Sequence, residues 1–262
     1  MLIDTHCHLD FKELAEDRAG VLERAMEAGV DRMITIATNK SRWPSYLQIA
    51  AENPNIYCSI GVHPESVGEP DEDFTAADII ALVNANPKVV GIGECGLDYH
   101  YEDAATPAMQ ARYFDEHIAA AQETGLPVII HARDADDDMA AQLHRRYREK
   151  SFTGLLHCFS STQKLAEAAL EIGFYVSFSG IVTFKNAKSI QDTARIVPVE
   201  KMLVETDAPF LAPVPMRGKS NEPSYVRYTA QYLADLKGLS LADFAAQTTR
   251  NAETVFSRLK AA

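Results

Sequence analysis

The opening segment of the chain carries two histidines one residue apart, His6 and His8, in the run Met-Leu-Ile-Asp-Thr-His-Cys-His. If this segment is a strand, alternate side chains point to the same face, and both imidazoles project together. Two neighbouring neutral imidazole nitrogens are typical of one half of a metal site. The pair alone is a weak signal, so its interpretation depends on the polar residues that follow.

Further histidines and acids come directly after short apolar runs: His63 (Gly-Val-His-Pro), Glu94 (Gly-Ile-Gly-Glu-Cys), His131 (Val-Ile-Ile-His), His157 (Leu-Leu-His-Cys) and Asp207 (Glu-Thr-Asp-Ala-Pro). Each one alone is commonly a hydrogen-bonded core residue or a helix cap. Together at one rim they would bury several polar groups without partners, which is costly unless a cation compensates. Even four of these five imidazoles, with the two carboxylates, are too many ligands for one tetrahedral zinc and indicate two divalent ions, which a carboxylate can bridge.

The elements that position these residues alternate between β-rich runs and longer amphipathic runs, which is typical of a parallel sheet wrapped by helices. We expect helices at 12–28, 41–53, 75–86, 107–124, 135–149, 162–172, 186–196, 223–236 and 240–259. We expect strands at 2–7, 32–37, 56–62, 88–94, 127–131, 154–158, 174–178 and 202–206. Glycines 29, 125 and 173 are predicted to end helices, and Thr106-Pro107 is predicted to begin one.

Eight strand–helix units in 262 residues predict an α/β fold, a (β/α)8 TIM barrel, as one domain over residues 1–262. The competing open sheet usually has a Gly-rich phosphate loop after its first strand, and His-Cys-His-Leu-Asp is no such loop. Catalytic residues of these barrels lie at the carboxyl ends of the strands. In this arrangement we expect Glu94 at the end of the fourth strand and each of the other polar residues at the end of its own strand.

Composition restricts the class of protein. The net charge is −12, which argues against a protein that coats duplex DNA but not against a nuclease. The four cysteines form no Cys-x-x-Cys pair and are read as small buried hydrophobes. There is no secretory signal and no apolar run that could span a bilayer, so we expect a cytoplasmic protein without membrane contact. We also expect a monomer.

The motifs together closely resemble the TatD family of metal-dependent hydrolases. The matching segments are Asp4-Thr-His-Cys-His-Leu-Asp10, Gly61-Val-His-Pro64, Gly91-Ile-Gly-Glu-Cys-Gly-Leu-Asp98, Ile130-His-Ala-Arg133, Leu156-His-Cys-Phe159, Phe178-Ser-Gly180, Glu205-Thr-Asp-Ala-Pro209 and Asn221-Glu-Pro223. The resemblance covers residues 1 to about 258. It implies one divalent ion held by His6, His8, Glu94 and Asp207, and a second held by Glu94, His131 and His157. It also implies deoxyribonuclease activity, with 3′→5′ exonuclease action on single-stranded DNA.

The expected mechanism is metal-assisted attack of water on a phosphodiester, with Asp207 as general base. The resemblance places His63 near the substrate phosphate, and Arg133 either adds a second donor or pairs with Asp134 or an acidic residue of a neighbouring helix. Imidazole ligands favour Zn or Ni, whereas phosphoryl transfer favours Mg or Mn.

Substrate contacts are expected from residues that follow the strands. The candidates for base stacking are Tyr99, Tyr101, Phe184 and Phe210, although aromatic residues at loop bases usually pack. Arg217 and Lys219 form a basic cluster after the last strand, which is either a phosphate site or a solvated loop. Glu205 and Asn221-Glu222 are expected to support the site, whereas His100 is assigned to a loop and His117 and His144 to helix surfaces.

Two alternatives stay open at this point. The same metal site could hydrolyse carboxylic esters, amides or lactones, including removal of a D-amino acid from tRNA, because the ligand set does not select the bond. The second alternative is a non-catalytic barrel with structural metals that serves as a binding partner. The complete ligand set and the candidate base argue against it.

Overall fold

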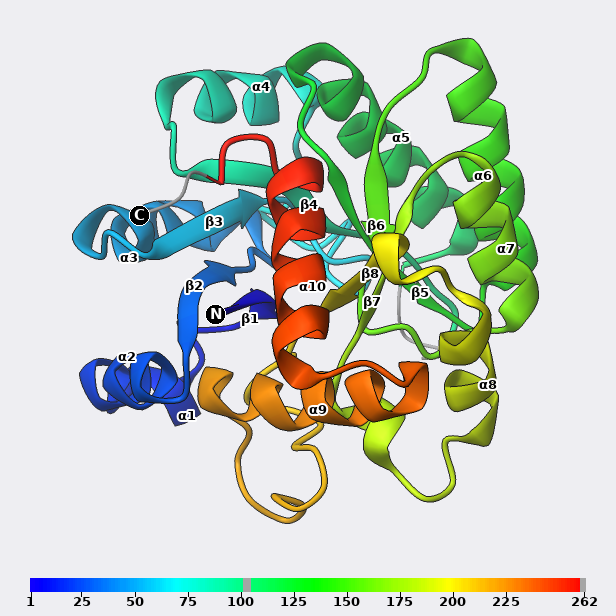
Figure 1. The fold of residues 1–262 in the computed structure, drawn as a ribbon. Coiled ribbons are helices and arrows are strands. Elements are labelled where there is room, and N and C mark those ends of the chain that lie inside the picture. The colour runs from blue at the N-terminus through cyan, green and yellow to red at the C-terminus, as the bar shows by residue number, and fades with distance from the viewer. Residues whose placement is uncertain (101–104, 260–262) are drawn as a thin grey trace.

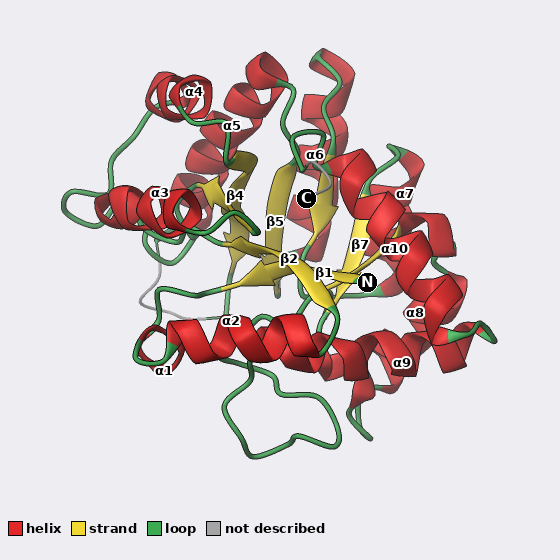
Figure 2. Ribbon diagram, turned by 60° about the vertical axis from the view of Figure 1, so that its left-hand side comes forward, coloured by secondary structure: helices red, strands yellow, loops and turns green. Residues whose placement is uncertain are grey.

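The computed structural model describes residues 1–100 and 105–259, in which eight parallel strands are surrounded by helices (Figures 1 and 2). The strands are β1 (Leu2–Cys7), β2 (Val30–Thr35), β3 (Ile56–Ile60), β4 (Val89–Asp98), β5 (Val128–Arg133), β6 (Gly154–Leu156), β7 (Tyr175–Phe178) and β8 (Met202–Val204). They are hydrogen-bonded in chain order, and a bridge between Cys7 and Ala208 brings the first and last strands together. The predicted (β/α)8 barrel is confirmed.

The helices follow the strands and cover the outside of the barrel (Figure 2). They are α1 (Lys12–Ala15), α2 (Arg18–Glu27), α3 (Trp43–Glu52), α4 (Ala76–Ala85), α5 (Pro107–Thr124), α6 (Asp136–Glu149), α7 (Gln163–Glu171), α8 (Lys188–Ile196), α9 (Val226–Lys237) and α10 (Leu241–Val255). Short 3₁₀ turns are η1 (Lys40–Arg42), η2 (Gly180–Thr183), η3 (Val199–Lys201) and η4 (Pro223–Tyr225). None of the helices in the described part of the chain has both the length and the apolar character needed to cross a bilayer.

The predicted helix ends agree with the structure at the glycines and at the start of α5. Glycines 29, 125 and 173 have φ values of 81°, 72° and 83°, which is the conformation that stops a helix. The Thr106 side chain accepts a hydrogen bond from the backbone N–H of Met109. The predicted helix over 12–28 is wrong, because Asp17 leaves the helical conformation and forms the N-cap of a second helix.

The fourth strand also differs from its prediction, because it does not end at Glu94. β4 continues to Asp98, with an irregularity between Ile92 and Cys95, after which Cys95–Asp98 pair with Ile130–Arg133 of β5. At Gly96, φ is 140° and an added Cβ would collide with the backbone of His131. Glycine at this position therefore lets β4 and β5 stay paired on both sides of Glu94.

One half of the barrel interior is apolar. Each strand contributes one buried residue to it, namely Ile3, Ile34, Tyr57, Val90, Ile129, Leu155, Tyr175 and Leu203. The end of α10, which crosses in front of the strands in Figure 1, adds Val255 and the fully buried Phe256. These side chains fill the barrel at the amino end of its strands, and the candidate ligand side chains lie at the other end.

Candidate metal centre

The six side chains predicted as metal ligands lie together at the carboxyl end of the barrel. Three of them are on strands: His6 is in β1, Glu94 in β4 and His131 in β5. The other three directly follow strands: His8 comes after β1, His157 after β6 and Asp207 shortly after β8. Four of the six, His6, His8, Glu94 and His157, are buried.

Glu94 lies at the centre of this cluster. Its Oε2 is 3.3 Å from Nε2 of His6. Its Oε1 is 2.7 Å from Nε2 of His157 and 3.1 Å from Nδ1 of His131. The two oxygens of one carboxylate therefore face different histidines, as required of a carboxylate that bridges two cations.

The first group of side chains comes from the junction of β1 and β8. Oδ1 of Asp207 is 3.6 Å from Nε2 of His6 and 3.3 Å from Nε2 of His8. The three ligand atoms lie within 4.8 Å of one another. Asp207 has a φ of 58°, which is uncommon for a residue with a Cβ, and its backbone N–H donates to the carbonyl of His6. This constrained backbone is typical of a functional position.

The second group contains His131 and His157, and a carboxylate supports each imidazole from behind. Nε2 of His131 is 2.8 Å from Oδ2 of Asp98. Nδ1 of His157 is 3.3 Å from Oε1 of Glu205. A carboxylate that accepts one imidazole N–H fixes the ring and leaves the other nitrogen available to a metal.

Asp98 is a site residue that the sequence reasoning missed. It lies four residues after Glu94 in the motif Gly-Glu-Cys-Gly-Leu-Asp. Because side chains two and four positions apart share a face of a strand, its spacing from Glu94 was a usable signal. The predicted end of the strand at Glu94 hid that signal.

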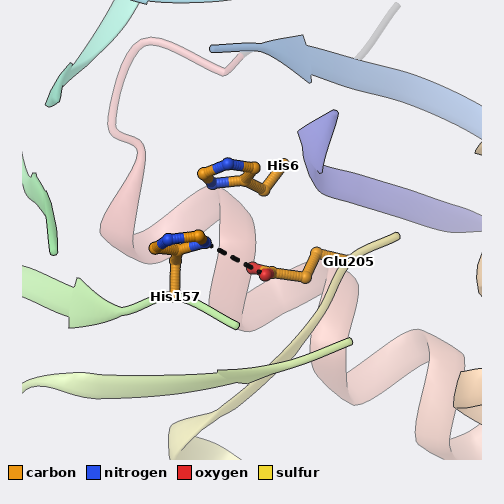
Figure 3. Close-up of side chains that lie close together, drawn as sticks. All are labelled: His6, His157 and Glu205. Carbon is orange, nitrogen blue, oxygen red and sulfur yellow. Dashed lines mark hydrogen bonds and ion pairs between the residues drawn. The ribbon is translucent and has the colours of Figure 1, made fainter. Parts of the chain in front are cut away.

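Glu205 connects the two groups. His6 and His157 stack with their ring centroids 3.9 Å apart and an interplanar angle of 8°, and Glu205 lies beside both rings (Figure 3). The Glu205 carboxylate is fully buried, and its Oε1 accepts a hydrogen bond of 2.7 Å from the backbone N–H of Cys158. Ligand atoms of His6, His157 and Glu205 also lie within 4.8 Å of one another. Its position agrees with the supporting role predicted for it.

Charges in the cluster favour an ionised Glu94. Burial opposes ionisation, but the neighbouring imidazoles of His157 and His63, with hydrogen bonds from His131 and His157, outweigh it and hold the pKa of Glu94 well below its usual value. Burial and the neighbouring His157 lower the pKa of His6, which keeps that imidazole neutral. A carboxylate and a neutral imidazole are the protonation states in which Glu94 and His6 would bind a metal.

Several buried polar atoms of the cluster have no hydrogen-bond partner within the described part of the chain. They are Nδ1 and Nε2 of His6, Nδ1 of His8 and Oε2 of Glu205. Buried polar atoms are normally hydrogen-bonded, and those left without a partner destabilise the fold. Divalent cations between these nitrogens and carboxylates would satisfy the ligand atoms, so the residues present fit a metal centre.

The cluster opens into a cavity of about 800 Å³. His63 and Arg133, two of the predicted substrate contacts, line it, and so does His100. Nε2 of His63 is 3.5 Å from Oε1 of Glu94. The structure therefore places His63 beside the predicted metal ligands and within reach of a bound substrate.

The other predicted substrate contacts lie elsewhere. Tyr99 lines a neighbouring groove of about 600 Å³, and its hydroxyl hydrogen-bonds to Asp138. Arg217 and Lys219 are exposed and are not among the described residues that line the cavity. The Arg217 guanidinium lies 3.9 Å from the centroid of the Phe184 ring. Tyr101 lies outside the described residues.

His117 was expected on a helix surface, and this prediction is wrong, since the side chain is buried with 1% of its surface exposed. Its Nε2 accepts a hydrogen bond of 3.0 Å from the backbone N–H of Val62, and its Nδ1 lies 2.8 Å from the carbonyl of Tyr113. The imidazole is therefore neutral with its proton on Nδ1, and it fixes the backbone immediately before His63. Helical periodicity did not distinguish this polar core position from a surface one.

Comparison with known proteins gives one family over almost the whole chain. The family described as "TatD related DNase" matches residues 3–257. The "uncharacterized metal-dependent hydrolase YabD" of Bacillus subtilis is 39% identical over 257 residues, which cover 98% of this chain and 99% of that protein. The "3′-5′ ssDNA/RNA exonuclease TatD" of Erwinia tasmaniensis is 34% identical and covers 98% of this chain and 100% of its own length.

The fold agrees with that of a solved relative. The crystal structure of YJJV, a TatD homologue from Escherichia coli, superposes with a TM-score of 0.87 at 29% identity and covers 98% of both chains. The arrangement of eight strands and their helices in this chain is therefore shared with that homologue.

Proposed function

The chain belongs to the TatD-related DNase family, and from this premise we propose that it is a divalent-metal-dependent hydrolase that shortens single-stranded DNA from its 3′ end. The observation that carries the proposal is the Glu94 carboxylate, whose two oxygens face separate groups of ligand side chains. The exonuclease name of the Erwinia tasmaniensis relative supports the choice of substrate. A cytoplasmic location and a monomeric state stay predictions from the sequence.

We assign His6, His8, Glu94 and Asp207 to one ion and Glu94, His131 and His157 to a second. When bound, the two ions supply Lewis-acid activation of a water and of a phosphate oxygen. Zn, Ni, Mn and Mg are the candidate ions, because the imidazoles favour the first two and phosphoryl transfer the others.

Asp207 is the proposed general base. Burial raises the pKa of a carboxyl group, but a hydrogen bond with His8 and the proximity of the other imidazoles outweigh it and lower the pKa of Asp207. The carboxylate is therefore ionised at neutral pH, and it lines the cavity. In this position it can accept the proton of the attacking water.

His63 is the proposed donor to the phosphate. Its Nδ1 accepts a hydrogen bond of 3.2 Å from the backbone N–H of Glu65. The neutral ring therefore carries its proton on Nε2, the nitrogen that faces the metal ligands. That N–H can donate to an oxygen on which charge develops, and Arg133 in the same cavity offers a second donor.

Tyr99, Arg217 and Lys219 are proposed contacts to a longer strand. Tyr99 lies in the groove that adjoins the cavity, and the loop that carries Arg217 and Lys219 follows β8. Arg217 and Lys219 are exposed, which leaves them accessible to a phosphate backbone, whereas the half-buried Tyr99 is proposed to contact a base.

The test is digestion of a single-stranded oligonucleotide labelled at its 5′ end, after chelation of the protein and re-addition of single divalent ions. We expect a ladder of progressively shorter labelled products with at least one ion and none with chelator. Turnover of an aminoacyl ester without any shortening of DNA would instead support the carboxylic-ester alternative and overturn the proposal. Release of internal fragments before terminal nucleotides would contradict exonuclease action.

A further inference from the structure

The walls of the main cavity differ in chemical character. Over β7, β8 and β1 the lining is apolar, with Phe11, Ile181, Phe210 and Leu211. Over β3, β4 and β5 it is polar or charged, with Glu65, Asp98, His100, Arg133 and Asp134. The catalytic chemistry described above uses the floor and the polar wall only, so the apolar wall has no role in it.

Phe210 is the most exposed part of the apolar wall, with 51% of its surface accessible. Its backbone is nevertheless held in place. Its N–H donates to the carbonyl of Asp207 at 2.9 Å, and its carbonyl accepts from Nδ2 of the buried Asn221 at 2.6 Å. The same amide donates to the carbonyl of Thr206. A large apolar ring on a fixed backbone at the mouth of a cavity is ready to bind a ligand without reorganisation.

Phe11 extends this surface down to the predicted metal ligands. Its ring lies 5.8 Å from that of Phe210 at an angle of 84°, and it stacks on the imidazole of His8 at 4.7 Å and 23°. The His8 and Phe210 rings are 6.4 Å apart. The two phenylalanines are therefore next to the reacting centre. The part of a bound strand that could reach them is the nucleotide being cleaved, and not a remote one.

Beyond Arg133, the groove that adjoins the polar wall disfavours a phosphate backbone. Its lining includes Asp134, Asp136, Asp137 and Asp138. Like charges in such a groove repel a polyanion. The base, which is the flat and uncharged part of a nucleotide, should therefore face the apolar wall and not the acidic groove.

We propose that Phe11 and Phe210 form the binding site for the base of the 3′-terminal nucleotide. This inference rests on the proposed function and names the part of the substrate that the site recognises. Stacking on the rings requires an unpaired base and reads no hydrogen-bond pattern. The site therefore selects single strands over duplex ends and tolerates any of the four bases.

The experiment compares two single-stranded oligonucleotides that differ only at the 3′-terminal residue, which is either a normal nucleotide or an abasic analogue. For the unaltered protein we expect kcat/KM to be about 5- to 150-fold higher with the base present, which is the effect of stacking one base. In Phe210→Ala, kcat/KM should fall for the substrate with the terminal base and stay unchanged for the abasic substrate, so the preference should drop to near unity. Phe210→Trp should retain it.

Ile196→Ala serves as the matched control, because Ile196 is 46% exposed on α8 and is not among the described residues of the cavity lining. It should leave the preference unchanged. Equal rates on both substrates in the unaltered protein, or a full preference in Phe210→Ala, would overturn the base site while leaving the exonuclease proposal intact. Absence of shortening with either substrate would instead overturn the proposed function.

Binding without turnover gives a second measurement. A 3′-terminal 2-aminopurine is quenched when it stacks, so its fluorescence should fall on addition of metal-free protein. The fall should be smaller with Phe210→Ala and with Phe11→Ala, whereas Ile196→Ala should match the unaltered protein. Equal quenching in all four proteins would contradict the proposed site.

Discussion

The two ends of the barrel interior are built from opposite kinds of residue. At the amino end, one apolar side chain from each strand packs with the last turn of α10 around the fully buried Phe256. At the carboxyl end, histidines and acids surround Glu94, and several of their buried polar atoms have no hydrogen-bond partner within the described residues. One end therefore supplies folding free energy, whereas the other leaves ligand atoms available.

This division explains how the chain accommodates an unfavourable cluster. Burial of unsatisfied polar atoms destabilises the protein, and the apolar end offsets that loss with close packing. Substitutions at the two ends should accordingly have separate effects, on stability at the amino end and on metal binding and catalysis at the carboxyl end.

The largest effect is expected from Asp207→Asn at the carboxyl end. The amide cannot accept the proton of the attacking water, so kcat should fall by about 10²- to 10⁴-fold. The free energy of unfolding should stay within about 1 kcal/mol, because the amide has nearly the same size and shape as the carboxylate. Rates from single-turnover digestion and a urea titration measure the two quantities. Activity that remains unchanged would exclude Asp207 as the base.

Phe256→Ala at the amino end should give the opposite result. Removal of this fully buried ring leaves a cavity and should lower the free energy of unfolding by about 3–5 kcal/mol. Activity per folded molecule should be unchanged, because Phe256 lies among the residues of the apolar end. Ile196→Ala, at an exposed position, should change stability by less than about 0.5 kcal/mol. A loss of activity without a loss of stability in Phe256→Ala would contradict the division.

His117 accepts a hydrogen bond from the backbone next to His63 and should contribute to stability in a pH-dependent way. Burial lowers the pKa of His117 to about 4 from an ordinary 6.5. The folded state therefore binds its proton more weakly than the unfolded state, so this contribution is complete above pH 6.5 and is lost as the pH falls towards 4. The loss should be about 3 kcal/mol.

The comparison variant is His117→Gln, whose carbonyl oxygen can replace Nε2 as the acceptor from Val62. The difference in unfolding free energy between the two proteins should shrink or reverse between pH 6.5 and pH 4. A difference that is independent of pH would show that His117 does not titrate in this range.

The smallest effect is expected from Asp98→Asn, which weakens the support of one histidine and keeps all six proposed ligands. The amide is a poorer acceptor for the N–H of His131, so metal affinity should fall by about 10- to 100-fold. Isothermal titration with Zn or Mn measures this change. Asp115→Asn is a suitable control, because Asp115 pairs with Arg145 on the outside of the barrel. Equal affinities in Asp98→Asn and the unaltered protein would show that the carboxylate does not support the site.

The sequence predicts the fold and the side chains gathered at the carboxyl end of the barrel better than it predicts the residues that hold those side chains in place. Alternating β-rich and amphipathic runs give the order of the elements, and polar residues after apolar runs identify the cluster. Asp98 was missed because β4 continues past its irregularity to Asp98, whereas the apolar run alone predicts that the strand ends at Glu94. His117 was assigned to a surface because a neutral imidazole with two backbone partners has no signature in a helical pattern.

The aromatic residues show a further limit. Phe11 directly follows the segment that carries the candidate ligands His6 and His8, yet only the packing of its ring on His8 shows that it lines the cavity. Tyr99 and Phe184, which looked equivalent to Phe210 in the sequence, turn towards Asp138 and Arg217. Such contacts depend on loop conformations, which residue types alone do not determine.

The most direct test of the proposed bridging role of Glu94 is the number of metal ions bound per chain in Glu94→Gln and in the unaltered protein. Chelated protein would be titrated with Mn or Zn, dialysed and assayed for metal content, and circular dichroism would confirm that both proteins are folded. The unaltered chain should bind two ions, and Glu94→Gln should lose tight binding of both, because the amide offers one neutral oxygen in place of two charged ones. Two ions retained in Glu94→Gln, or none bound by the unaltered chain, would contradict the bridge.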